Sequence, residues 1–262
     1  MSRPSTLSSV FERVYSLDVV FQPECWKLCG DAHCCSFARH KERFRLLGRM
    51  GPPAQELPLL PGEYDFLHAR GWTAQFHGHE RKLAPFDFGP AVIHLDTITS
   101  TRPHCACDHD TRTTVCRLYP LLPVFDTAGA LVSTEPLGIY EELEILDGLA
   151  PACRLDSLPF SQLNLYLELA ALLGAHPVAR FHLMAYRLVK RHVAERVRNE
   201  KNAGGRDAFA VFEAAYMRRK LLDQETLKAA LAELWEAFVS RHGADFTDAL
   251  AELRKACPPG AS

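Results

Sequence analysis

Seven of the nine cysteines of this 262-residue chain fall in two short runs within its first 116 residues. The first run comprises Cys25, Cys29, Cys34 and Cys35, and the second comprises Cys105, Cys107 and Cys116. Clustered thiols bring several ligands to one place at a low cost in loop-closure entropy, which is what a metal centre requires. We therefore expect the N-terminal half to fold around metal, with these seven cysteines as its ligands.

The cellular compartment determines whether such clustered cysteines form disulfides or bind metal. The segment Met1–Thr6 has no apolar signal core, and nowhere does the chain approach the roughly 18 uncharged apolar residues of a membrane span. We expect a cytoplasmic protein with no membrane contact, in which reduced thiols bind metal rather than form disulfides. The formal charge of −2 argues against nucleic acid as a partner.

The spacing of the thiols bears on which metal is bound. Neither run contains the Cys-x2-Cys pair of zinc knuckles or the Cys-x3-Cys-x2-Cys pattern of radical-SAM enzymes. An irregular all-thiolate set suits an iron–sulfur cluster, for example 4Fe–4S, at least as well as a zinc or iron ion. Seven thiols exceed the four that one centre takes, so either two centres form or some cysteines only pack.

The two remaining cysteines are poorer candidates. Cys153 lies near the end of the first half of the chain and Cys257 lies in its tail. Isolated cysteines more often pack as small apolar residues than bind metal. We expect Cys257 to lie outside any site and assign no ligand role to Cys153.

The motif Cys25-x3-Cys29-Gly-x3-Cys34-Cys35, followed by Cys116-Arg-Leu-Tyr-Pro120, resembles the YkgJ-like family of cysteine-cluster proteins, described as zinc- or iron-chelating. Leu59–Glu63 looks like the family's usual helix opening, and the resemblance covers about residues 20–125. The spacing is looser than the family's Cys-x2-Cys-x2-Cys-Cys, and the Cys105-Ala-Cys107 pair departs from it, which leaves the ligand set open.

The resemblance implies metal binding but no single activity. Flagellin lysine methylases are similar to the family in carrying a related cysteine motif around an iron–sulfur cluster. This chain, however, contains no Gly-rich strand-to-helix turn of the kind that binds a methyltransferase cofactor. The sequence therefore gives no support for a methyltransferase.

Two further patterns carry weaker signals. His77 and His79, with Asp108, His109 and Asp110, would form a histidine–carboxylate site with open coordination positions if the fold brought them together. We favour the plainer interpretation, that they are solvated or capping loop residues. The stretch 178–220 holds eleven basic residues against four acidic ones and would suit an acidic protein or peptide partner. A solvated helix face is the plainer interpretation there too.

The apolar pattern predicts an α+β protein. Residues 1–157 should form a small mixed metal-binding domain with short strands, packed on an all-helical region of residues 158–262. In the first half we expect a helix opened by a capping box at Ser9 and Glu12, further helices at 36–47, 61–71 and 137–146, strands at 73–77, 91–98 and 115–119, and a hairpin turn at 126–129. In the second half we expect helices at 160–173, 178–200, 207–221, 224–241 and 245–256.

Three classes of function remain open. The leading one is a cysteine-cluster protein whose metal has a structural, redox or metal-presenting role. The second is an iron-dependent oxidoreductase or an enzyme that modifies a peptide or protein. The third is an interaction adaptor in which zinc only staples the fold. An enzyme needs a metal with an open coordination position, whereas an adaptor needs a closed four-thiolate site.

Overall fold

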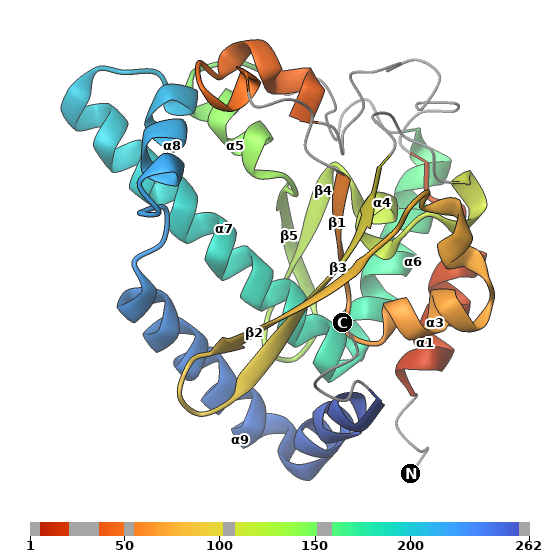
Figure 1. Cartoon of the computed structure of the whole chain (residues 1–262). Coiled ribbons are helices and arrows are strands. Elements are labelled where there is room, and N and C mark those ends of the chain that lie inside the picture. The colour runs from red at the N-terminus through yellow and green to blue at the C-terminus, as the bar shows by residue number, and fades with distance from the viewer. Residues whose placement is uncertain (1–5, 21–36, 50–54, 102–107, 151–158, 257–262) are drawn as a thin grey trace.

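A computed structural model of the chain describes residues 6–20, 37–49, 55–101, 108–150 and 159–256. Within them, a three-stranded and a two-stranded antiparallel sheet lie among helices, and the chain is helical from α6 onward (Figure 1). The expected α+β class is therefore confirmed. Among the described helices, none has the length and apolar character needed to cross a membrane.

The first helix begins earlier than its sequence pattern predicts. Helix α1 (Leu7–Ser16) buries Leu7, Val10, Phe11 and Val14 on one face. Its N-cap, however, is Thr6, whose extended backbone lets its hydroxyl accept from the Ser9 amide. The capping box predicted at Ser9 is therefore wrong, because the cap lies three residues upstream.

The three-stranded sheet has the order β1-β3-β2 and consists of β1 (Gln55–Leu59), β2 (Arg81–Asp87) and β3 (Val92–Ser100). Strand β3 confirms the strand expected at 91–98. The strand expected at 73–77 is instead a 3-10 turn, η4 (Trp72–Gln75), because Gly71 takes a positive φ of 70° and turns the chain after α3 (Glu63–Ala69).

The segment expected as a strand at 115–119 is a short helix, α4 (Thr114–Leu118). Its β-branched residues favour a strand. Two caps override that preference: the Thr113 hydroxyl accepts from the Cys116 amide, and the buried Glu63 carboxylate accepts from the Thr114 amide at 2.6 Å. The hairpin expected around 126–129 is confirmed, formed by β4 (Leu121–Phe125) and β5 (Leu131–Pro136).

The remaining helices follow the expected pattern closely. They are α5 (Ile139–Leu146), α6 (Phe160–Ala175), α7 (Pro177–Gly204), α8 (Ala208–Met217) and α9 (Gln224–Ala256). Helix α9 is interrupted at Gly243, where φ is 53°, so it matches the two helices expected on either side of that glycine. The helix expected at 36–47 is replaced by two 3-10 turns, η2 (Phe37–Arg43) and η3 (Leu47–Arg49).

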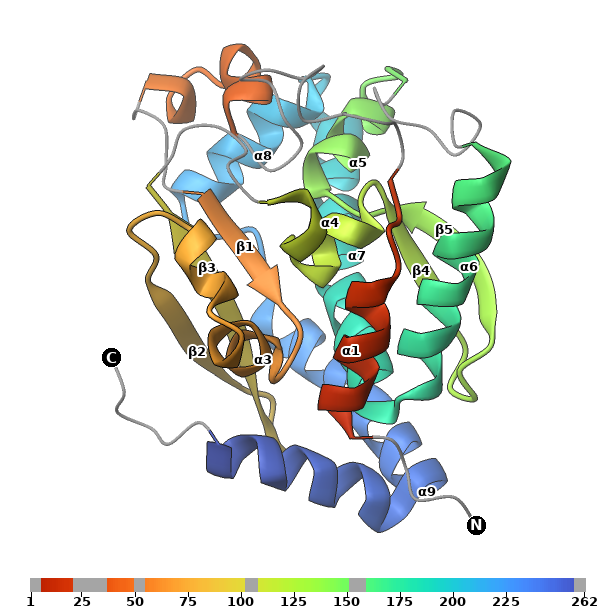
Figure 2. The same ribbon diagram turned by 90° about the vertical axis from the view of Figure 1, so that its right-hand side faces the viewer.

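One hydrophobic core joins the two halves of the chain. It takes residues from α1, β4, α6, α7 and α9, and Phe181 of α7 lies 5.3 Å from the rings of both Phe238 and Phe246 in α9. Helix α7 runs diagonally through the molecule (Figure 1), and α1 lies beside α6 (Figure 2). The domain boundary expected between residues 157 and 158 stays a prediction. The hydrophobic core described here contains residues from both sides of it.

Two helical expectations need correction. Residues 160–173 are apolar on nearly all sides of the helix, which predicts a buried helix. Helix α6 instead buries only one face, since Phe160 is 78% exposed while Tyr166 is fully buried. On α7, Arg180 and Lys190 are buried rather than solvated. Their charges are stabilised internally: Arg180 donates to the main-chain oxygens of the 126–129 turn and of Gly174, and Lys190 donates to Pro136 and contacts Glu142 at 2.7 Å.

Candidate metal-binding junction

Of the seven predicted metal ligands, Cys116 is the one within the described residues. Cys25, Cys29, Cys34, Cys35, Cys105 and Cys107 lie outside them, as do Cys153 and Cys257. Cys116 is half-buried on α4, where the hydroxyl of Thr113 donates to its sulfur at 3.2 Å. It packs against the apolar cluster between α3 and the three-stranded sheet.

The described ends of the two cysteine runs meet at one place, which we call the junction. It consists of residues 17–20, which lead toward the first run, and residues 108–112, which directly follow Cys107. Two arginines join them. Arg117 donates to Leu17 O at 2.6 Å, to Arg112 O at 3.2 Å and to Asp110 O, while Arg112 donates to Val19 O and His109 O.

The arginines of the junction are buried among main-chain oxygens. Arg117 is 1% exposed, and burial lowers its pKa to about 10, so the guanidinium remains charged near neutral pH. Its face lies 4.7 Å from the ring centroid of Tyr15. Hydrogen bonds from a charged donor are worth about 1.5–3 kcal/mol each, so these contacts fix the two chain segments firmly together.

A buried carboxylate, Glu63, links the helices that surround the junction. Glu63, at the start of α3, accepts from the Tyr15 hydroxyl at 2.7 Å and from the main-chain amides of Thr114 and Leu60. Burial raises the pKa of Glu63, and the two amides counteract this. The carboxyl thereby joins α1, α3 and α4, the element that carries Cys116.

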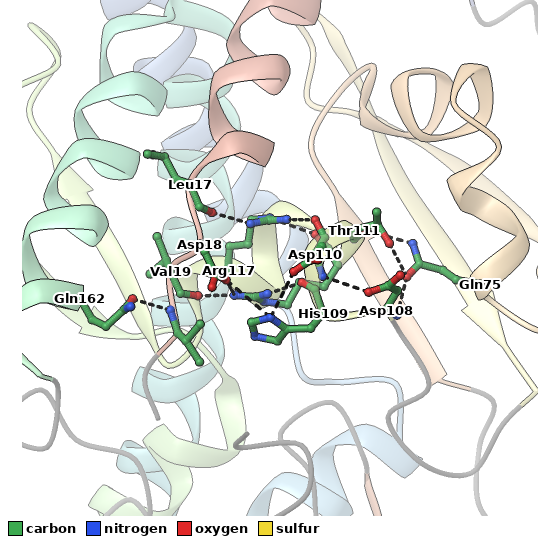
Figure 3. A network of polar contacts seen from close by, with 12 residues as sticks. Leu17, Asp18, Val19, Gln75, Asp108, His109, Asp110, Thr111, Arg117 and Gln162 are labelled. Atoms are coloured by element: carbon green, nitrogen blue, oxygen red, sulfur yellow. Dashed lines mark hydrogen bonds and ion pairs between the residues drawn. The ribbon is translucent and has the colours of Figure 1, made fainter. Parts of the chain in front are cut away.

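Three side chains of kinds that can bind a metal ion gather at the exposed side of the junction. The Nδ1 atom of His109 lies 3.5 Å from Asp18 Oδ1 and 3.8 Å from Asp110 Oδ1 (Figure 3). The carboxylates are exposed and the imidazole is partly buried. Burial, followed by the charge of Arg112, lowers the pKa of His109.

This group differs from the histidine–carboxylate site that the sequence indicated. His109 and Asp110 take part, but Asp108 instead caps η5 (His109–Thr111) by accepting from the Asp110 amide at 3.2 Å. His77 and His79 are not members of the group found among the described residues. Asp18 was missed because about 90 residues separate it from His109, and only the fold shows their proximity.

The residues that follow the first cysteine run are held at a different place. The side chain of Arg43 in η2 contacts Asp147 at 2.8 Å, and Glu213 of α8 accepts from the main-chain amides of Arg45, Leu46 and Leu47. Residues 43–47, which come after the first run in the sequence, are therefore held against α5 and α8.

Comparison with protein-family models, with curated proteins and with solved structures finds no match to this chain.

Proposed function

We propose that this chain is a metal-binding cysteine-cluster protein. Cys25, Cys29, Cys34, Cys35, Cys105, Cys107 and Cys116 supply the thiolates for an iron–sulfur cluster or a zinc or iron ion. The observation that carries the proposal is the gathering of seven thiols in two runs of a chain with nine cysteines. The resemblance to the YkgJ-like family adds to it.

The junction supports the proposal from the structural side. Cys25 follows Val20 by five residues and Cys107 directly precedes Asp108, so the chain allows Cys25 no more than about 18 Å from Val20. Arg112 and Arg117 hold the two flanking segments in contact. Residues 17–20, before the first run, and residues 108–112, after Cys107, therefore belong to the same part of the fold. A shared centre then needs little extra loop closure.

The metal has a structural, redox or metal-presenting role in this proposal, in the reducing environment of the cytoplasm. The enzymatic alternative is an iron-dependent oxidoreductase or a peptide- or protein-modifying enzyme, and it requires an open coordination position on the metal. The adaptor alternative requires a closed four-thiolate zinc site. The chemistry of the bound metal therefore separates the three functions.

Metal and acid-labile sulfide analysis of anaerobically purified full-length protein, with an optical spectrum, tests the proposal. Iron with stoichiometric sulfide and a broad visible absorbance from thiolate- and sulfide-bound iron supports a cluster. Zinc without sulfide contradicts the cluster and supports a zinc centre. Absence of any metal after anaerobic purification and after reconstitution with iron, sulfide or zinc contradicts the whole proposal.

A partner surface is the second part of the proposal, and the structure narrows where it lies. Several basic residues of the stretch 178–220 are already paired inside the protein, such as Arg187 with Glu135 and Lys201 with Asp147. At the end of α8, the exposed cations Arg218, Arg219 and Lys220 follow the exposed side chains of Tyr216 and Met217.

Charge complementarity favours an acidic peptide segment with an apolar anchor as the occupant of this surface, which we call the α8 tip (Tyr216–Lys220). Arg219 adopts a positive φ of 55° just after the C-cap of α8, where the Lys220 amide donates to Ala215 O, so the three cations follow a tightly closed helix end. Among the described residues, no acidic side chain forms an ion pair with these three exposed cations, which leaves them available to a partner.

Binding of a labelled 15-residue peptide, rich in Glu and with a central Leu-Phe pair, tests the α8 tip by fluorescence anisotropy. We expect the double variant Arg218→Glu/Arg219→Glu to weaken binding at least tenfold. The control Arg191→Glu, an exposed cation of α7, should change it less than twofold. Equal effects of both variants, no binding of the peptide, or equal binding of its Gln-substituted form contradicts this surface.

A further inference from the structure

We propose that Asp18, His109 and Asp110 form a second cation site, made of oxygen and nitrogen ligands and selective for a divalent first-row metal such as Mn²⁺ or Fe²⁺. No cysteine takes part, so this site goes beyond the cysteine-cluster function proposed above. Carboxylate and imidazole ligands together favour these ions over the soft metals that thiolates select.

The geometry of the three side chains is close to that of a coordination sphere. Their ligand atoms all lie within 4.8 Å of one another, and both carboxylates approach the same nitrogen, Nδ1 of His109. Adjacent ligands around an ion with bonds of about 2.1 Å are roughly 3 Å apart. The two carboxylate oxygens lie 3.5 and 3.8 Å from His109 Nδ1. Rotation of the two exposed carboxylates by less than about 1 Å would bring these atoms to the spacing of ligands around one ion.

The backbone beneath the three ligands is held by interactions across the whole fold. Arg117 holds the main-chain oxygen of Asp110, and Arg112 bridges those of His109 and Val19, 93 residues away in sequence. The Asp108 side chain fixes the amide of Asp110 at 3.2 Å. The ligands are thus prepositioned by buried groups, unlike neighbouring acids on a mobile surface, and preorganisation of this kind favours binding.

Charge and exposure set the expected character of the site. The side chains of Asp18 and Asp110 are 65% and 86% exposed, so water can complete the coordination sphere. Arg112 lies 3.7 Å from Asp18 Oδ1, and its positive charge opposes a cation there. The same guanidinium donates to the main-chain oxygens of His109 and Val19, which fixes its position beside Asp18. We expect moderate affinity and exchangeable metal.

Titration of the full-length protein with Mn²⁺, followed by the electron paramagnetic resonance signal of the free ion, tests the site. One Mn²⁺ should bind per chain, with Asp18→Asn or Asp110→Asn weakening it at least tenfold. The control Asp248→Asn, an exposed carboxylate of α9, should leave binding within twofold of wild type. No saturable binding, or equal weakening in all three variants, overturns the site. Circular dichroism should show that each variant remains folded.

The same variants separate this site from the cysteine centre. Asp18→Asn should keep the metal and sulfide content of the anaerobically purified wild type, because it removes no thiolate. If that content falls together with Mn²⁺ binding, the three residues belong to the cysteine centre and the second site is overturned. If the wild type holds no thiolate-bound metal but binds Mn²⁺ through Asp18 and Asp110, the cysteine-cluster function fails and this site stands.

Discussion

The guanidinium of Arg117 donates to the main-chain oxygen of Leu17 at 2.6 Å, across 100 residues of sequence. This contact holds the end of α1 against the segment that follows the second cysteine run. Arg117 directly follows Cys116, and Tyr119, two residues later, donates its hydroxyl to the Glu141 carboxylate of α5. The non-cysteine residues of the Cys-Arg-Leu-Tyr-Pro motif thus tie the chain around Cys116 to two different elements.

Replacement of Arg117 by methionine should destabilise the protein strongly. Methionine fills most of the volume but leaves the main-chain oxygens of Leu17, Asp110 and Arg112 without this donor. We expect the free energy of unfolding to fall by about 3 kcal/mol, partly offset because a buried charge is also removed. Urea unfolding monitored by circular dichroism measures the change.

The matched control for that variant is Arg198→Met, on the exposed face of α7. Surface substitutions of this kind usually change stability by less than about 0.5 kcal/mol. A loss of similar size in the two variants would show that the Arg117 contacts add nothing beyond an ordinary surface arginine, and the junction would then need another source of rigidity.

The sequence predicted elements well where one local signal decides them. The turn at 126–129 follows from Asp126, whose carboxylate accepts from the Gly129 and Ala130 amides within the turn itself. The break in α9 follows from Gly243. The amphipathic helices of the second half follow from periodicity, which reports directly on burial.

The prediction was wrong where a distant residue decides the outcome. Residues 115–119 have strand-like composition, but Glu63, 51 positions earlier, caps them as a helix. Arg180 lies on the polar stripe of its helix, yet the 126–129 turn draws it into the interior. Asp18 joins His109 only through the junction. In each case the energy comes from a tertiary contact that no sequence window contains.

The cysteine assignments predict a contrast between single substitutions. Cys29→Ser and Cys116→Ser should each lose bound metal and destabilise the N-terminal half, because a serine hydroxyl is a poor substitute for a thiolate ligand. Cys257→Ser should do neither. Metal content and thermal unfolding of the three purified variants provide the comparison, and equal metal retention in all three would show that the ligand set is wrong.

Acid should weaken the fold through His182 on α7. Desolvation lowers the pKa of this histidine to about 4, and its Nδ1 donates to Val178 O at 3.0 Å. A folded pKa below the unfolded value of about 6.5 means that stability present above pH 6.5 is lost as the pH falls toward 4. The loss attributable to this group approaches about 3 kcal/mol.

The variant His182→Gln cannot take up that proton, so its stability should fall less than that of the wild type between pH 7 and pH 4.5. Urea unfolding of both proteins at both pH values gives their stabilities. Comparing the pH-dependent loss of the variant with that of the wild type cancels the contribution of the groups that titrate in both. The exposed His68→Gln serves as the comparison and should follow the wild type. Parallel losses in wild type and His182→Gln would remove His182 as the cause.

Gly129 and Gly89 offer a matched pair for the packing of the β4–β5 turn against α6 and α7. Both have a φ near 100°, so an alanine at either position carries a similar backbone cost of about 1–2 kcal/mol. A Cβ at Gly89 meets nothing within 4 Å, whereas a Cβ at Gly129 collides with the Arg180 guanidinium and with the main-chain oxygen of Gly174. Gly129→Ala should therefore lower the free energy of unfolding by about 1–3 kcal/mol more than Gly89→Ala does.

The size of that extra loss reports on how firmly Arg180 and α6 hold the turn, because relief requires the guanidinium to move and the turn to shift from the main-chain oxygen of Gly174. Urea unfolding of Gly89→Ala and Gly129→Ala, each measured at pH 7 against the wild type, isolates the collision from the shared backbone cost. If the two variants lose the same free energy, the turn can move away from α6 without penalty, and Arg180 does not fix it in place.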